Sequence, residues 1–437
     1  MSEEVAVVGA GLAGLVAARR LADAGVDVRV YETRDSVGGR VRSRHRDGFV
    51  LDRGFQVLFT AYPAVRTELD LDALDLRGFS PGAVLCSTAE GTRAVLSDPL
   101  RDPGALVESV LNLEVPTSDK LRTLLLRQDL RSREESEFFQ GSDESIRAYL
   151  DDWGFSESYV EKFVAPFYGG ITLDRSLATS SQVFQYTFRT LSRGRIAVPA
   201  DGMGAIAEQL ADRARAAGVE IVRNEGVAAV EHDRGGGRTR GAGPVGFETT
   251  EASREADAVV VAADPRSARE LTGVDTIPTE GKSSTTQFYS LPEHARVETG
   301  DKILLHTDGA SPNVVVPLSE VAPEYAPDGR ELLCATFLGE DALERDEESL
   351  AADTRAALSA WYPEQSFESL EPIHTDRLRF AQFAQPPGVF DDLPSVTAPS
   401  GSVYLAGDYT EWSSIQGAME SGQAAASAVL SAEPVGE

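Results

Sequence analysis

The sequence has few cysteines and few histidines. Its two cysteines, Cys86 and Cys334, are too few for a disulfide framework, and neither stands at metal-ligand spacing from other ligating residues. The five histidines are scattered along the chain and form no triad or ligand pattern: His45, His232, His294, His306 and His374. We therefore expect buried thiols, no metal site and no histidine that is marked as a catalytic base.

Long hydrophobic runs are also missing. The longest apolar stretch opens at Val5, is rich in glycine and ends at Arg19 and Arg20, well short of a membrane span. No basic segment followed by an apolar stretch and a cleavage site is present near the start. These absences predict a protein that is made and kept in the cytoplasm.

Lysine is scarce in a strongly acidic chain. Lysine and arginine together number 41 against 70 acidic residues, and only four of the 41 are lysines, which gives a formal net charge of −29. Such a charge repels nucleic acid, so we expect no nucleic-acid partner. A lysine-poor, carboxylate-rich surface resembles proteins of salt-loving archaea, where a Debye length of about 3 Å in molar salt screens the self-repulsion. The charge therefore indicates habitat and says little about chemistry.

The first forty residues carry a dinucleotide fingerprint. An apolar strand over 5–9 leads into a helical pattern over 12–24, and a second strand follows over 27–32. Between the first strand and the helix lie the residues that would surround a pyrophosphate: Gly9, Ala10, Gly11, Leu12, Ala13 and Gly14. The three glycines permit a tight turn, close backbone approach to the pyrophosphate and close helix packing. Glu32, at the end of the second strand, is placed to accept hydrogen bonds from the ribose hydroxyls.

A second glycine motif follows at once. Gly38 and Gly39 imply close backbone approach, and Arg40 can reach the same pyrophosphate with two hydrogen bonds. With the preceding helix, this Gly-Gly-Arg resembles the entry signature of the superfamily of flavin amine oxidases and phytoene (carotenoid) desaturases, which also includes protoporphyrinogen oxidases.

Further segments extend this resemblance over nearly the whole chain. The stretches 48–56, 199–230 and 403–429 are similar to segments that this superfamily places around its cofactor, and 256–265 resembles the strand that closes its second sheet. The resemblance implies FAD as the cofactor, held by further residues of these stretches: Gly54, Phe55, Gln56, Val227, Gly407, Asp408, Gln416, Gly417 and Ala418. Asp408 would hold flavin-side hydroxyls, and the helix that begins near Gln416 would direct its positive end at the flavin.

The strand pattern predicts an α/β fold built from interleaved segments. Buried strands at 5–9, 256–263 and 402–408 are typical of a parallel sheet, whereas 60–195 reads as helical and 283–340 as antiparallel strands. We expect a Rossmann-type, doubly wound FAD-binding domain interleaved with an α+β substrate-binding domain. The expected FAD-binding segments are 1–60, 196–272 and 391–437, and the expected substrate-binding segments are 61–195 and 273–390; the glycine-rich 234–243 is expected to be a turn between hairpin strands.

Two departures from the superfamily bear on how the flavin is attached and on which side chains are catalytic. Covalent monoamine oxidases carry a cysteine just before the C-terminal helix, where this chain has Ser413 and Ser414, so the resemblance implies non-covalent FAD. Many amine oxidases also place a lysine near the flavin. Lys282 and Lys302 are the candidates here, and both are better explained as surface lysines, so the catalytic side chains stay unassigned.

The middle of the chain favours the desaturase branch. Residues 149–181, with Pro166 and Phe167, look like the segment whose helices line the substrate cavity of desaturase-like proteins, and 378–390 is similar to the stretch that these proteins place before the C-terminal motif. Nearby aromatic residues could wall an apolar tunnel or simply form core: Phe163, Phe167, Tyr168, Phe184, Tyr186 and Phe188.

We expect an oxidoreductase that dehydrogenates an apolar isoprenoid or carotenoid-like small molecule by hydride transfer to flavin N5, with an electron acceptor that the sequence does not name. An amine oxidase, a protoporphyrinogen oxidase-like enzyme and a non-redox FAD-dependent isomerase are the alternatives.

Peripheral membrane contact is a further expectation. Residues 119–130 contain Leu121, Leu124, Leu125 and Leu126 with arginines among them, a pattern that fits either a helix lying on a bilayer or an ordinary helix of the substrate domain.

Overall fold

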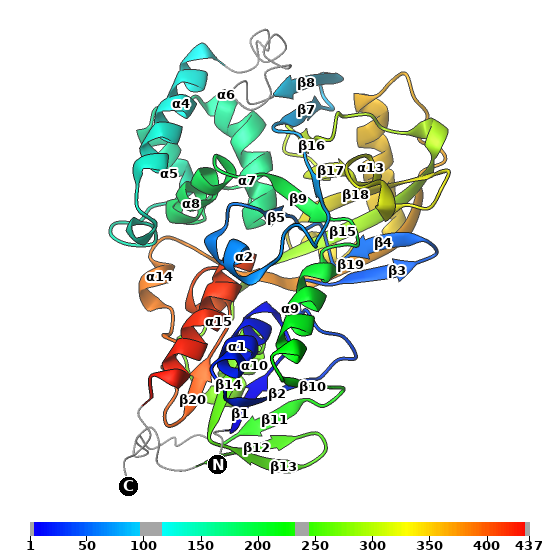
Figure 1. Cartoon of the computed structure of the whole chain (residues 1–437). Helices are drawn as coiled ribbons and strands as arrows, with labels where there is room; N and C mark the ends of the chain where they lie inside the picture. The colour runs from blue at the N-terminus through cyan, green and yellow to red at the C-terminus, as the bar shows by residue number, and fades with distance from the viewer. Residues whose placement is uncertain (1–3, 97–115, 232–243, 433–437) are drawn as a thin grey trace.

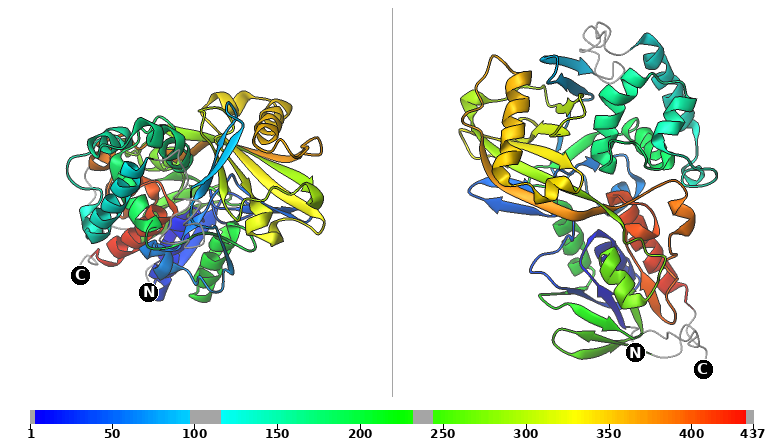
Figure 2. Two further views of the ribbon diagram at one scale, coloured as in Figure 1. Left: turned by 90° about the horizontal axis from the view of Figure 1, so that it is seen from above. Right: turned by 180° about the vertical axis from the view of Figure 1, so that it is seen from behind.

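A computed structural model describes residues 4–96, 116–231 and 244–432. His232 and the expected turn over 234–243 lie outside these residues. The chain forms two lobes that are joined by long connecting segments (Figures 1 and 2). In the part described, no helix has the length and apolar character needed to cross a membrane.

The lower lobe in Figure 1 is built on a five-stranded parallel sheet. Its strands, in spatial order, are β10 (Glu220–Arg223), β2 (Asp27–Glu32), β1 (Glu4–Val8), β14 (Ala258–Val261) and β20 (Val403–Leu405). The central and C-terminal strands β1, β14 and β20 are nearly continuous apolar runs because both faces of the sheet are covered there. Segments from the start, middle and end of the chain therefore meet in one sheet.

Different layers cover the two faces of this sheet. Val5 and Val7 pack on the face covered by helices, and the alternate residues Ala6 and Val8 pack on the other face. The helices of the first face are α1 (Leu12–Asp23), α9 (Gly204–Ala216) and α15 (Ile415–Leu430). The second face is covered by α10 (Pro265–Thr272) and a small antiparallel sheet of β11 (Val227–Val230), β12 (Val245–Thr249) and β13 (Ser253–Ala256). The Rossmann-type α/β fold predicted from the sequence is confirmed.

The upper lobe is built on a seven-stranded mixed sheet. Its strands, in spatial order, are β19 (Glu371–Phe383), β15 (Gly281–Pro292), β18 (Arg330–Leu338), β17 (Val314–Pro317), β16 (Ile303–His306), β7 (Ala83–Ser87) and β8 (Thr92–Leu96). β7 and β8 correct the expectation that 60–195 is helical, because β7 pairs in parallel with β16, far away in the sequence. One face carries α12 (Asp341–Glu344) and α13 (Glu347–Trp361).

Helices cover the other face of this sheet. They are α4 (Thr117–Ser132), α5 (Ile146–Asp152), α6 (Glu157–Tyr159), α7 (Ala165–Thr172) and α8 (Ser181–Leu191). Leu126 of α4 is buried among these helices, whereas Leu121, Leu124 and Leu125 are 58%, 46% and 51% exposed. Membrane contact through this exposed face stays a prediction.

Short elements connect the two lobes. They include a hairpin of β3 (Ser43–Arg46) and β4 (Phe49–Asp52) and a three-stranded sheet in the order β5 (Leu58–Phe59), β9 (Ile196–Pro199) and β6 (Leu76–Gly78). The remaining short helices are α2 (Pro63–Glu68), α11 (Leu318–Val321) and α14 (Val389–Asp392).

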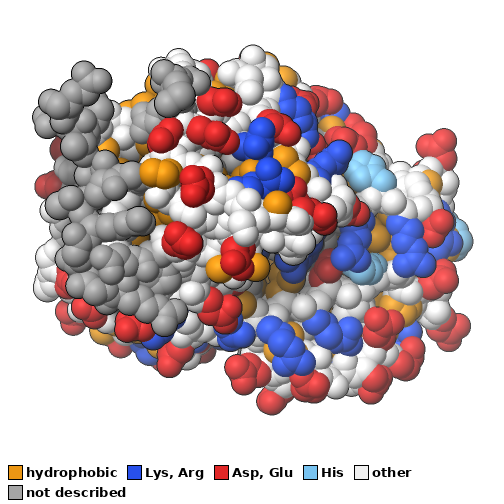
Figure 3. Space-filling model, turned by 90° about the horizontal axis from the view of Figure 1, so that it is seen from below, with side chains coloured by type: hydrophobic (Ala, Val, Ile, Leu, Met, Phe, Trp, Pro, Cys, Tyr) orange, Lys and Arg blue, Asp and Glu red, His pale blue; other side chains and the backbone are white. Residues whose placement is uncertain are grey.

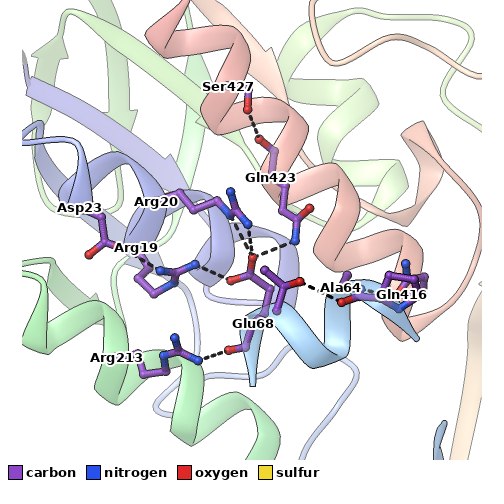
Figure 4. A network of polar contacts seen from close by, with 11 residues as sticks. Arg19, Arg20, Asp23, Ala64, Glu68, Arg213, Gln416, Gln423 and Ser427 are labelled. Atoms are coloured by element: carbon purple, nitrogen blue, oxygen red, sulfur yellow. Dashed lines mark hydrogen bonds and ion pairs between the residues drawn. The ribbon is translucent and has the colours of Figure 1, made fainter. Parts of the chain in front are cut away.

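A buried carboxylate on α2 ties this connection to the lower lobe (Figure 4). Glu68 is fully buried and accepts hydrogen bonds from Arg19 at 2.6 Å, from Arg20 at 2.6 and 2.9 Å and from Gln423 at 2.8 Å. Its backbone carbonyl accepts one more, from Arg213. Burial alone would raise the pKa of Glu68, but the hydrogen bonds and charges of the two α1 arginines lower it below its ordinary value. Helices α1, α2, α9 and α15 therefore converge on this one residue.

Candidate active site

A cavity of about 940 Å³ runs between the two lobes. Most of the residues predicted to bind the cofactor line it: Gly9, Gly11, Leu12, Ala13, Glu32, Gly38, Gly39, Arg40, Gly54, Phe55, Gln56, Val227, Gly407, Asp408 and Ala418. The exceptions are Ala10, Gly14, Gln416 and Gly417. The structure thus brings residues from both ends and the middle of the chain around one space, and their contact with the cofactor stays a prediction.

The first glycine loop is packed too tightly for side chains. A β-carbon on Gly14 would lie 2.1 Å from the carbonyl oxygen of Gly9, and one on Gly9 would lie 2.7 Å from that of Ala262. Gly9 also has a φ of +103°, which favours glycine. A β-carbon on Gly11, in contrast, would meet no protein atom within 4 Å and would stand in open space. Gly14 thus supports the loop from behind, and Gly11 faces the space that a pyrophosphate would fill.

Glu32 is fixed at the end of β2 by backbone groups. Its two carboxylate oxygens accept hydrogen bonds from the Ala10 N–H at 2.9 Å and the Arg34 N–H at 3.0 Å. Ala10 therefore orients the acid and does not itself line the cavity. A carboxylate oxygen can accept more than one hydrogen bond, so Glu32 keeps capacity for ribose hydroxyls.

Arg40 lies between the second glycine pair and the C-terminal strand. Its guanidinium donates to Asp408 Oδ1 at 2.6 Å and to the Ala381 carbonyl at 3.2 Å. Burial alone would lower the pKa of Arg40, but the Asp408 carboxylate raises it above its ordinary value. Asp408 also accepts a hydrogen bond from Ser413 at 2.8 Å. Two residues that the sequence assigned separately to the cofactor thus form one neutral pair.

The loop after β4 passes the cavity with its backbone. Gly54, with a φ of +79°, and Phe55 line the cavity, and Gln56 holds the loop by donating to the Arg40 and Arg53 carbonyls. Asp52, just before them, does not line it.

Asp52 accepts hydrogen bonds from Ser43, from the Met203 N–H at the start of α9, and from Tyr325. Burial raises the pKa of Asp52 to about 6. The side chain of Asp52 therefore joins β3, β4 and α9 and supports the cavity wall from behind.

At the start of α15, the residues that line the cavity directly precede the predicted Gln416 and Gly417. Ser413, Ser414 and Ile415 line it, together with Ala418. The amide of Gln416 instead accepts from the Ala64 N–H at 3.0 Å and donates to Glu420, and Gly417 donates to the Ser414 hydroxyl at 2.8 Å. The N-terminus of a 16-residue helix still faces the cavity and favours negative charge there.

The upper part of the cavity is apolar. Its wall is formed by side chains from the mixed sheet, α7 and α8 and the connecting strands: Phe55, Phe59, Tyr62, Phe79, Pro166, Phe167, Ile171, Leu173, Val183, Ile196, Ile303, Leu305, Val314 and Trp412. Pro166 and Phe167 thus lie where the sequence predicts. The other five candidate aromatics pack into the core and do not line the cavity, because their helices present them to one another.

The carboxylates that line the cavity are confined to its dinucleotide end, whereas lining arginines also come from β19 of the upper sheet, at Arg377 and Arg379. The carboxylates that line it in the described part of the chain are Glu32, Asp264 and Asp408, and none belongs to the apolar wall. Lys282 donates to Asp174 at 2.9 Å, and neither Lys282 nor Lys302 lines the cavity. Lys302 is buried, with its Nζ directed to the Gly300 carbonyl, which corrects the expectation of a surface lysine. His306 is buried against Thr88 and the Pro312 carbonyl, away from the cavity, and burial lowers its pKa. The part of the chain that the structure describes has no cluster of three metal-ligating residues.

Sequence reasoning missed several residues that line the cavity. They are Thr33, Arg34, Arg53, Asp264, Pro265, Arg266 and Ser267, and the β19 residues Arg377–Gln382. Arg34 stands two residues after Glu32, and Arg53 directly precedes Gly54, so proximity to predicted residues was an available signal. β19 reaches the cavity through its pairing with β15, which no local pattern reveals.

Fold and cavity together define a dinucleotide-dependent enzyme in which cofactor and substrate share one enclosed space. Residues 12–430 match the family described as flavin containing amine oxidoreductase. The chain belongs to this family, and it is an FAD-dependent oxidoreductase. The cradle of glycines that β-carbons would fill, with Glu32 beside it, fits this cofactor.

Similar proteins with known names differ in their reactions. The chain is 30% identical to protoporphyrinogen oxidase 2 of Arabidopsis thaliana over 170 residues, 38% of this chain and 32% of that protein. It is 47% identical to 15-cis-phytoene desaturase of Narcissus pseudonarcissus over 64 residues, 14% of this chain and 11% of that one. The matches thus span about a third or less of these relatives.

Solved structures confirm the fold over the full length. A putrescine oxidase has a TM-score of 0.71 at 18% identity, covering 98% of this chain and 99% of that one. Cyclohexylamine oxidase from Brevibacterium oxydans has a TM-score of 0.66 at 18% identity, with 98% and 99% covered.

A half-buried carboxyl lies behind the apolar wall. Glu420 of α15 accepts a hydrogen bond from Gln416 at 2.6 Å. The pKa of Glu420 is raised to about 7, mainly by burial and also by the nearby carboxylates of Glu411 and Glu135, against the opposing effect of the hydrogen bond from Gln416.

The raised pKa of Glu420 predicts that the stability of the folded protein depends on pH. The pKa of Glu420 is higher in the folded chain than in the unfolded one, so the folded state binds the proton more tightly and stability falls as the pH rises through about 7. Allowing for solvent screening, we expect a loss of about 1–2 kcal/mol between pH 5 and pH 8.5. Glu420→Gln should flatten the curve of melting temperature against pH, whereas Glu248→Gln, at an exposed position, should not. An unchanged curve for Glu420→Gln would show that this carboxyl is not protonated at pH 5.

Proposed function

We propose that the enzyme dehydrogenates a neutral, apolar small molecule of the isoprenoid or carotenoid type. The observation that carries this proposal is the contrast between the two parts of the cavity: every lining carboxylate in the described residues is at the dinucleotide end, and the other end is walled by apolar side chains. An amine substrate that binds as a cation would find no carboxylate there. A long apolar substrate would gain burial energy along the whole wall.

The side chains would act by positioning and by excluding water. Phe55, Phe167 and Trp412 would hold the substrate, and the first turn of α15 would stabilise negative charge that develops on the cofactor. FAD, when bound, supplies the hydride acceptor at N5. In the described residues that line the cavity, no lysine or histidine is available as a base, which suits a reaction that needs orientation and dryness more than acid–base catalysis.

The alternatives predict different products. An amine oxidase would convert an amine to an aldehyde, a protoporphyrinogen oxidase would act on a cyclic tetrapyrrole, and an FAD-dependent isomerase would leave the mass unchanged. The named relatives include a desaturase, in keeping with the proposed reaction, and a protoporphyrinogen oxidase, in keeping with the second alternative.

Product mass separates these outcomes. The purified protein would be incubated with phytoene, a protoporphyrinogen and a panel of amines, each with a soluble quinone as electron acceptor, and the products would be analysed by mass spectrometry. We expect a polyene product that is two mass units lighter for each new double bond. An isomer of equal mass, or turnover of the amines alone, would contradict the proposal.

A further inference from the structure

Three arginines stand together at the dinucleotide end of the cavity. Arg34 and Arg53 line it, and Arg42 lies beside them. Among the residues that the structure describes, none of the three forms an ion pair with a carboxylate. Arg42 donates only to the Ser36 hydroxyl, at 3.3 Å, and its buried Nε has no hydrogen-bond partner. Glu32 and Asp35 lie near Arg42, and Asp376 lies near Arg53, but among the described residues none of these carboxylates is within ion-pair distance of the three arginines.

Arg53 is held in place by its neighbours in the chain. Its backbone N–H donates to the Arg42 carbonyl at 2.9 Å, and Asp52 before it is buried in the hydrogen-bond network that joins β4 to α9. Its guanidinium donates to the Gly39 carbonyl at 3.1 Å. A β-carbon on Gly39 would in turn lie 3.4 Å from the Cα of Gly11. Gly39 therefore lies between the Arg53 guanidinium and the glycine loop that faces the pyrophosphate space.

The surroundings of Arg53 disfavour its charge. Burial lowers the pKa of Arg53, and the neighbouring charges of Arg42 and Arg34 lower it further, while the more distant Asp376 raises it. Arg42 and Arg53 stand opposite each other at the end of the β3–β4 hairpin, where like charges repel. An anion bound between them would relieve this repulsion. On the face of the molecule seen from below, basic side chains gather toward the centre and right of the view, with acidic side chains scattered around them (Figure 3).

Arg40, by comparison, brings no net charge to the cavity. Its guanidinium is already neutralised by Asp408 at 2.6 Å. A diphosphate carries two negative charges, and the helix N-terminus of α1 compensates only part of one. A guanidinium without a carboxylate partner can supply further positive charge to such a ligand.

We propose that Arg53 is a binding residue for the diphosphate of the dinucleotide and supplies the positive charge that the Arg40–Asp408 pair does not. The guanidinium would donate to a phosphate oxygen on the side opposite the Gly9–Gly14 loop, with Arg34 beside it. The inference rests on the proposed function only in that FAD is the ligand, and it is independent of the substrate.

The test measures cofactor binding without turnover. FAD-free protein would be titrated with FAD, and the dissociation constant would be read from the quenching of flavin fluorescence. Arg53→Met should weaken FAD binding by about ten- to a hundredfold, the effect of losing a charge-assisted hydrogen bond, and should reduce the dependence on salt. Competition by ADP, which carries the diphosphate without the flavin, should weaken by the same factor. Arg53→Lys should recover part of the loss.

Arg44→Met is the matched control. Arg44 is exposed on β3 near the same charges but does not line the cavity, so its removal should change FAD affinity by no more than about twofold. An equal loss in both variants, or an Arg53→Met protein that binds FAD and ADP as the wild type does, would overturn the inference. A wild-type protein that binds no FAD would instead overturn the proposed function. Melting curves of the FAD-free variants exclude a loss of folding as the cause.

Discussion

Glu68→Ala is expected to lower the free energy of unfolding by about 3–5 kcal/mol, the cost of leaving buried charges without their partner. Glu68 is the shared acceptor for Arg19, Arg20 and Gln423, so its removal leaves two guanidiniums of α1 facing each other (Figure 4). Because α1 begins at the glycine loop, FAD retention should fall as well.

Asp23→Asn is the control for this change. Asp23 accepts from the same Arg19 at 2.5 Å, but its side chain is 50% exposed, so its loss should cost about 1 kcal/mol or less. Thermal melts of both variants and of Glu68→Gln would be compared at the same pH and salt concentration. Equal melting temperatures for Glu68→Ala and Asp23→Asn would show that the buried ion pairs of Glu68 contribute no more to stability than the exposed ion pair of Asp23.

Gly14→Ala is expected to give a protein without bound FAD. The new β-carbon would lie 2.1 Å from the Gly9 carbonyl oxygen and 3.1 Å from the Ala262 β-carbon, and the Gly9 backbone cannot shift easily. The loop must therefore deform where it faces the pyrophosphate space. We expect FAD occupancy after gel filtration to fall at least about tenfold, as measured from the ratio of flavin to protein absorbance.

Gly11→Ala separates the two roles of the glycine loop. Its β-carbon meets no protein atom within 4 Å, so the FAD-free variant should melt at the wild-type temperature while FAD binding weakens. A Gly14→Ala protein that is purified with full FAD occupancy would refute the requirement for a glycine at that position.

The sequence predicted those parts of the site whose physical requirement is local. A glycine loop between a strand and a helix, an acid at the end of the next strand and a helix N-terminus near the end of the chain each require particular residues at short spacing. Glu32, for example, is fixed by N–H groups of residues 10 and 34, and its position follows from the length of the strand.

Other features could not be predicted because they depend on packing between distant segments. Arg40 and Asp408 each suited the cofactor when considered alone, and only the fold shows that they neutralise each other across 368 positions. β7 reads as an isolated apolar run until β16 pairs with it. Arg53 carries no signal of its own, because an arginine beside a glycine is ordinary until its surroundings are known.

The central claim is that the chain holds FAD as a resident, non-covalent redox cofactor and uses it on a neutral apolar substrate. The most direct measurement is the absorbance of the bound flavin near its visible maximum when the protein is mixed with substrate in the absence of oxygen and of any other acceptor. The account predicts a yellow protein that releases its flavin on acid precipitation, and whose flavin is bleached by a neutral polyene such as phytoene and not by putrescine or cyclohexylamine. Bleaching by the amines alone, or flavin that stays in the acid precipitate, would contradict it.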